Sequence, residues 1–186
     1  MKHTEYAQQL VAMIEKDQAT LGELFEKGEI GPHQPYHPVL KALHQSHKEA
    51  LGAIIEDIGW PTISSVGQKA SEAAWLVAQH AVLDTEFMSR CADLMEIELA
   101  NDDIEGWQLA FLRDRILTMS DQPQIYGTQF DEDEEGWPVP FPILDPETVN
   151  ERRRSLGLNT LEERTVEMRE RETARRAAVA KAEYRD

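Results

Sequence analysis

His80 and Asp84 are the residues whose types and spacing are most suggestive of chemistry. They lie in the segment QHAVLD, at the end of a run whose apolar residues recur at helical spacing over 68–82. At about 100° per residue, both fall on the apolar arc of that helix with Val77, and they are neighbours if the helix continues as far as Asp84. A carboxylate beside an imidazole fixes its tautomer and raises its basicity. The pair predicts a general base, His80, oriented by Asp84; alternatively, Asp84 caps the next helix.

His47 lies at the centre of the apolar face predicted for a helix over 38–58, and His44 lies at its edge. A buried imidazole needs a partner, because an unpaired buried polar group costs about 1–3 kcal/mol. One interpretation is a histidine satisfied within the core. The other is a metal site of His47, His80 and Asp84, since imidazoles and carboxylates suit zinc or iron. The spacing matches no HExxH-type signature. We therefore expect no cofactor, with zinc or iron as the alternative.

Asp114 lies in the helical pattern GWQLAFLRDRILTM, among apolar residues over most of the circumference. A carboxylate in such a position is costly unless it is paired. Arg113 and Arg115 flank it. The pattern indicates either a structural Asp–Arg pair or a catalytic acid, Asp114, with Arg115 available to a ligand.

The segment QIYGTQ gathers amide and hydroxyl side chains around a flexible glycine. Such groups orient a polar ligand well, because they donate and accept hydrogen bonds without a charge to desolvate. They could equally satisfy the backbone of their own loop. The predicted ligand-binding residues here are Gln124, Tyr126, Thr128 and Gln129.

The elements that position these residues are helices. The spacing of apolar residues predicts an all-α fold, a bundle of five to six helices. Residues 120–145 are expected to form an irregular, proline-rich strap across it. Low apolar content and Arg/Glu alternation predict a solvated C-terminal helix. We expect one helical domain over 1–158 and a charged helical tail over 159–186. The helices are expected at about 4–27, 38–58, 68–82, 85–99, 106–119 and 146–157.

The chain is strongly acidic, with a formal net charge of -16 over 186 residues. A nucleic-acid binder needs a basic face to displace counterions, so the composition argues against that class. An acidic surface instead suits a basic protein partner. The sequence does not indicate the oligomeric state.

No apolar run approaches the roughly 20 residues of a membrane span, and the N-terminus has no apolar signal core. We therefore expect a cytoplasmic protein with no membrane association. A single cysteine, Cys91, excludes an internal disulfide framework. The sequence also has no glycine-rich phosphate loop and no nucleophile elbow.

Several motifs occur in an ordered combination over about 45–163: GWPT, WLVAQHA, LRDRI, QIYGTQ and the proline-rich segment that leads into a run of arginines. In this order they resemble a bacterial family classed as a domain of unknown function. The resemblance implies no activity and assigns no catalytic residue. It implies that the segment 124–129 belongs with the helix bearing His80. The N-terminal helix, the acidic run 131–135 and the tail lie outside it.

Three functions are compatible with these residues. The first is an enzyme or binding protein for a small polar metabolite, with His80 as general base and Asp84 or Asp114 orienting it. The second is a metal-binding helical protein. The third is an inhibitor or immunity-type interaction protein, in which the polar cluster is structural.

Overall fold

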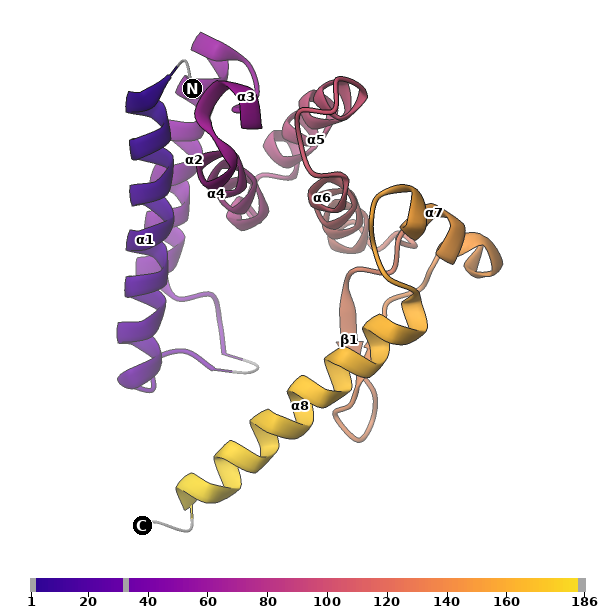
Figure 1. The fold of residues 1–186 in the computed structure, drawn as a ribbon. Helices are drawn as coiled ribbons and strands as arrows, with labels where there is room; N and C mark the ends of the chain where they lie inside the picture. The colour runs from indigo at the N-terminus through magenta and orange to yellow at the C-terminus, as the bar shows by residue number, and fades with distance from the viewer. Residues whose placement is uncertain (1–2, 32–33, 184–186) are drawn as a thin grey trace. The chain divides into compact units, whose positions relative to one another are not determined.

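A computed structural model describes residues 3–31 and 34–183 of the chain. The protein is mainly helical, as predicted. The helices are α1 (Thr4–Glu26), α2 (Pro38–Ile58), α3 (Ile63–Val66), α4 (Gln68–His80), α5 (Thr85–Ala100), α6 (Gly106–Met119), the 3-10 helix η1 (Pro146–Thr148), α7 (Val149–Ser155) and α8 (Leu161–Glu183); the strands are β1 (Phe130–Glu132) and β2 (Pro138–Pro140) (Figure 1).

The chain divides into two compact units, residues 1–108 and 109–186. The boundary falls inside α6, in a helical pattern that is continuous in the sequence. The boundary that we predict at residue 158 has a different origin, since it follows from composition alone. It stays a prediction.

The core of the first unit lies among α1, α2 and α4, which lie side by side (Figure 1). Each is amphipathic and buries one stripe of residues against the other two. The contact face of α4 is rich in alanine, and small side chains let helix backbones approach closely. The buried alanines of α4 are Ala70, Ala73, Ala74 and Ala78.

Turn chemistry sets the path from α2 to α4. Gly59 ends α2 with φ of 75°, a conformation that glycine adopts without steric cost. Thr62 then opens the short helix α3 with a reciprocal capping box to Ser65. We predicted only a loop here, because four residues are too few to show a helical period. Gly67 leads directly into α4.

Helix α4 ends at His80, and the chain turns at once into α5. The Asp84 side chain accepts a hydrogen bond from the Phe87 backbone N–H, at 2.9 Å, and so caps α5. Cys91 is fully buried on α5, and its burial raises the pKa of the thiol to about 12. The short turn brings the end of α4 and the start of α5 close together.

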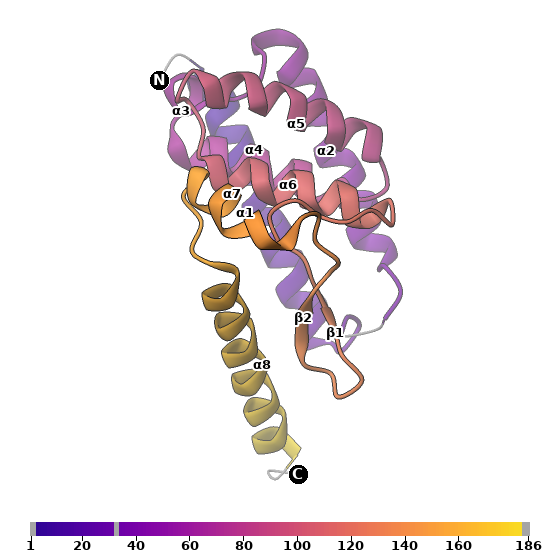
Figure 2. The ribbon, with the colours of Figure 1, turned by 90° about the vertical axis from the view of Figure 1, so that its right-hand side faces the viewer.

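The second unit contains the rest of α6, a β-hairpin and α7 and α8. Strands β1 and β2 pair antiparallel, with Phe130 opposite Pro140 (Figure 2). The strap that we expected to be irregular therefore contains a small sheet. Its proline strand tolerates the missing N–H donors because a two-stranded sheet has only edges. The Arg176 guanidinium of α8 stacks over the Trp137 ring of the hairpin, at 4.0 Å from the centroid.

Helix α8 forms the predicted solvated C-terminal helix. Most of its described side chains are exposed or half-buried. Its Glu172 carboxylate binds the guanidinium groups of Arg175 and Arg176, each at 2.7 Å.

None of the described helices combines a bilayer-spanning length with sufficient apolarity.

Candidate functional site

Asp17 is the centre of a buried cluster of titratable side chains in the first unit. It follows Leu10 by seven residues and Ile14 by three, so it lies on the buried stripe of α1. Only 1% of its surface is exposed. Since a buried carboxylate is costly without partners, its surroundings must supply them.

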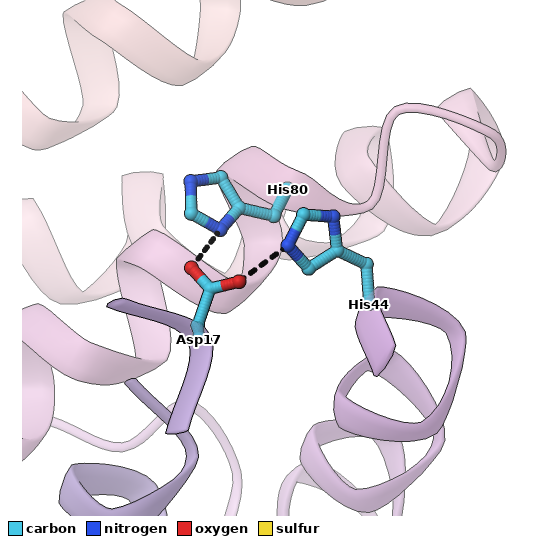
Figure 3. A group of neighbouring side chains, drawn as sticks. All are labelled: Asp17, His44 and His80. Carbon is cyan, nitrogen blue, oxygen red and sulfur yellow. Dashed lines mark hydrogen bonds and ion pairs between the residues drawn. The ribbon is translucent and has the colours of Figure 1, made fainter. Parts of the chain in front are cut away.

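Two histidines from different helices supply those partners. The Asp17 Oδ1 atom lies 2.6 Å from His44 Nε2 on α2, and Oδ2 lies 3.0 Å from His80 Nδ1 at the end of α4. Figure 3 shows the carboxylate between the two rings. The ring centroids of the histidines are 4.7 Å apart. The candidate ligand atoms of Asp17, His44 and His80 all lie within 4.8 Å of one another.

The charge on Asp17 is maintained by its neighbours. Burial alone raises the pKa of this carboxyl, but the hydrogen bonds to His44 and His80 outweigh it and hold the pKa well below its ordinary value of 3.8. Asp17 is therefore ionised at neutral pH. A fixed negative charge between two imidazoles can stabilise a cation there, whether a proton or a metal ion.

Tyr36 extends the cluster outward. Its hydroxyl makes a short hydrogen bond to His44 Nδ1, the ring nitrogen that does not face Asp17. Burial, followed by the charge of Asp17, raises the pKa of the Tyr36 phenol. The hydroxyl therefore keeps its proton at neutral pH and fixes the His44 ring.

A recess lies beside His44 and His80. Its cavity volume of about 10 Å³ gives room for one water-sized group. The recess is lined by Tyr36, Lys41, His44, Gln45, Lys48, His80, Ala81, Leu83 and Asp84.

Asp84, expected to orient His80, contacts Lys48 and the backbone of Phe87. Its Oδ2 lies 2.8 Å from the Lys48 ammonium, and Oδ1 caps α5. The hydrogen bond from Lys48 and then that from the Phe87 backbone lower the pKa of Asp84. The structure therefore gives Asp84 the capping role that we held as the alternative, and gives His80 a different carboxylate, Asp17.

His47 is buried on α2, as the helical wheel predicts. Burial lowers the pKa of its imidazole, which favours the neutral ring. It is not among the three residues whose candidate ligand atoms cluster. The metal set of His47, His80 and Asp84 stays a prediction, and of its members only His80 belongs to the cluster found among the described residues.

Asp114 lies in the second unit and binds backbone rather than a described histidine. Its carboxylate accepts hydrogen bonds from the N–H groups of Ile125, Tyr126 and Thr128, at 2.8–3.0 Å. Burial raises the pKa of the Asp114 carboxyl, and these N–H groups oppose that effect. The carboxylate holds the loop 124–129 in place.

Gln124 is also directed inward. Its side chain is fully buried. The Gln124 Nε2 group donates to the carbonyls of Gln129 and Phe141, and Gln124 Oε1 accepts from the Gln129 backbone N–H. The buried Arg153 guanidinium, which we did not single out, donates to the carbonyl of Tyr126 at 2.7 Å. These contacts fit the alternative that the loop satisfies its own backbone. Ligand binding by Gln124, Tyr126, Thr128, Gln129 and Arg115 stays a prediction, as does an association of this loop with the helix of His80.

Asp17 is the residue that our sequence analysis missed. The signal was present, because 10, 14, 17, 21 and 24 form one helical stripe in which Asp17 is the only charged residue. A charged residue at the centre of an apolar stripe is a better indicator of a site than a histidine at its edge.

No curated protein and no solved structure matches the chain. A family model matches residues 4–175. The match is longer than the 45–163 that we predicted, since it also includes α1 and much of α8. It spans the acidic run 131–135 as well, which we expected to lie outside the resemblance. Asp17, His44 and His80 all lie within it, and the chain thus belongs to a family of unknown function, DUF6624.

Proposed function

We propose that the protein is a metal-dependent enzyme for a small polar substrate, in which Asp17, His44 and His80 hold one divalent transition-metal ion. One observation carries the proposal. Three ligand-type atoms from three different helices lie within 4.8 Å of one another, at a place where the carboxylate is almost wholly buried. Buried polar side chains nearly always have polar partners, so three of them gathered at one place indicate a site.

The donor set suits such an ion. Two imidazole nitrogens and one carboxylate oxygen are the usual ligands of catalytic zinc and of non-haem iron(II). In a tetrahedral site, two ligands that are each about 2.1 Å from the ion lie roughly 3.4 Å apart. The candidate donor atoms all lie within 4.8 Å of one another, so the widest separation has to close by up to roughly 1.4 Å when an ion binds.

The surroundings of the three residues support the same conclusion. A metal-ligating histidine usually bonds a polar group through its other ring nitrogen, and Tyr36 has this position on His44. Three protein ligands leave a coordination position open, as in catalytic rather than structural sites. The recess of about 10 Å³ lies next to His44 and His80 and has room for a water molecule there. Such an ion lowers the pKa of water and polarises carbonyl or phosphoryl oxygens.

A second candidate needs no metal. Asp17 lies at hydrogen-bonding distance from both rings, and the other nitrogen of the His80 ring points away from Asp17 (Figure 3). About 29% of the His80 side chain is exposed. In this arrangement Asp17 orients His80, which acts as the general base on a bound substrate. The two candidates use the same residues and differ in metal content.

The deciding experiment is the metal content of untagged protein purified without chelator. We expect about one zinc or iron per chain in the wild type, and a loss of most of it in His80→Ala and in Asp17→Asn. The second variant keeps the shape of the side chain, so it tests binding even where His80→Ala is poorly folded.

Matched controls separate this site from general effects. His3→Ala and Asp57→Asn remove the same groups elsewhere on the first unit, and both should keep the ion. The Asp57 carboxylate accepts a hydrogen bond from Tyr6 in an exposed position. A folded wild type that contains no ion, and takes up neither Zn²⁺ nor Fe²⁺ on titration, contradicts the metal site and leaves the Asp17–His80 pair.

A further inference from the structure

The recess beside His80 has basic walls in an otherwise acidic protein. Lys41, His44 and Lys48 follow one another on α2 at steps of three and four residues, so they lie on one face of the helix. All three line the recess. Against a formal net charge of -16 for the whole chain, a stripe with two ammonium groups is a local exception.

Lys48 is held in place. Its ammonium group lies 2.8 Å from Asp84 Oδ2, and only 17% of the Lys48 side chain is exposed. Because Asp84 also caps α5, it is itself fixed. The lysine therefore reaches the recess in a preset conformation, and less side-chain entropy is lost when a ligand binds.

The charges around the recess can be compared directly. The ammonium groups of Lys41 and Lys48 offset the carboxylates of Asp17 and Asp84. A divalent ion on Asp17, His44 and His80 leaves a local charge of about +2. Since the recess is surrounded by low-dielectric protein, that charge acts strongly on a bound group.

We propose that the substrate carries an oxyanion, a phosphate or a carboxylate group, that binds in this recess between the ion and the ammonium groups of Lys41 and Lys48. The proposal rests on the function proposed above and names its substrate class. The cavity of about 10 Å³ has room for one water-sized group, so it admits one oxygen atom of the oxyanion rather than a whole metabolite. The rest of the substrate therefore lies outside the recess, towards solvent.

The test is calorimetric titration of the purified protein, as isolated, with inorganic phosphate and with acetate at constant ionic strength. We expect saturable binding of at least one of them, weakened about tenfold or more in Lys41→Ala and Lys48→Met, because each loses a charge-assisted hydrogen bond. The stronger binder distinguishes a phosphate from a carboxylate substrate. Helical circular dichroism checks that Lys48→Met is folded.

Lys69→Ala is the matched control, because Lys69 is an exposed lysine of the same unit that pairs with Glu15. It should bind both anions as the wild type does. The inference is overturned if neither anion binds saturably up to about 50 mM, or if the two recess variants bind as tightly as Lys69→Ala. Metal content is measured on the same samples. A bound ion without lysine-dependent anion binding contradicts only this inference. Lysine-dependent binding without an ion contradicts the metal site and the contact of the oxyanion with an ion, and supports an anion site formed by the lysines alone.

Discussion

At the scale of single residues, the sequence predicts which side chains are buried better than it predicts which of them meet. His80 and His47 are buried or half-buried on the helix faces that their spacing indicates. The partner of His80 could not be predicted, because Asp17 precedes it by 63 positions and only the packing of α1 against α4 brings the two together. Periodicity gives the face of a helix and not its neighbour.

Tyr36 provides the prediction that belongs to this scale. Tyr36→Phe removes the hydroxyl that fixes the His44 ring and leaves all three proposed ligands in place. We expect the ion to remain bound with an affinity about 10–100 times lower, because an outer hydrogen bond orients the ligand. Competition with a chromogenic chelator measures the affinity.

The same substitution at Tyr6 is the control. The Tyr6 hydroxyl donates to Asp57 at 2.7 Å, in an exposed position away from the proposed ligands. Tyr6→Phe should therefore bind the ion as the wild type does. Equal affinities in the two variants would show that Tyr36 has no role in holding His44.

At the scale of elements, long amphipathic helices were predictable and short elements were not. The predicted starts and ends of α1, α2 and α6 lie within a residue or so of those observed. α3 has four residues and each strand has three, which is too short for a period of 3.6 or 2 to be recognised. The loop that leads into the hairpin is held by Asp114 and Arg153, at positions distant in sequence, which periodicity cannot indicate.

Gly127 tests that loop. It has φ of 67°, and a Cβ there would lie 2.7 Å from Leu161 Cδ1 and 3.1 Å from Ile143 Cδ1. Gly127→Ala should therefore combine the backbone strain, about 1–2 kcal/mol, with a steric clash of about 1–3 kcal/mol. Urea unfolding measures the loss. Gly157 has a similar φ of 72°, and a Cβ there would have no atom within 4 Å. Gly157→Ala should therefore lower the free energy of unfolding only by the cost of backbone strain. Equal losses would mean that the loop is not tightly packed.

Glu172 makes α8 sensitive to acid. Its hydrogen bonds with Arg175 and then Arg176 lower the pKa of the Glu172 carboxyl from 4.5 to about 2. Because this pKa is depressed in the folded chain, the ion pairs stabilise the helix above about pH 4.5. That contribution is lost as the pH falls towards about 2. Nuclear magnetic resonance titration of the carboxyl carbon should show a midpoint near 2, which rises towards 4.5 in Arg175→Gln/Arg176→Gln. An unchanged midpoint in the double variant would contradict the role of these arginines.

At the scale of the whole molecule, composition indicates charge well and architecture poorly. The mainly helical class follows from the sequence, but the division into two units falls inside α6, where an uninterrupted apolar pattern gives no sign of it. The net charge does not depend on where the chain divides into units. An acidic surface that attracts a basic protein partner stays a prediction of the composition.

The net charge of -16 predicts that salt stabilises the protein. Like charges repel within the folded chain, and the Debye length falls from about 30 Å at 0.01 M to about 8 Å at 0.15 M ionic strength. We expect the melting temperature to rise by a few degrees over that range. This rise corresponds to a gain on the order of 1–2 kcal/mol in the free energy of unfolding. Scanning calorimetry in sodium chloride and in choline chloride gives the result. The two salts should act alike; a rise with sodium alone would indicate specific ion binding instead of screening.

The order of the three central residues along the chain has a consequence for synthesis. Asp17, His44 and His80 all precede residue 81, and the unit that contains them ends at residue 108. At about 5–20 residues per second, the ribosome needs roughly 4–16 seconds to add the remaining residues up to 186. The complete donor set is thus translated before any part of the second unit. If the proposed ion binds, the nascent chain can meet it during translation, when the loop held by Asp114 does not yet exist.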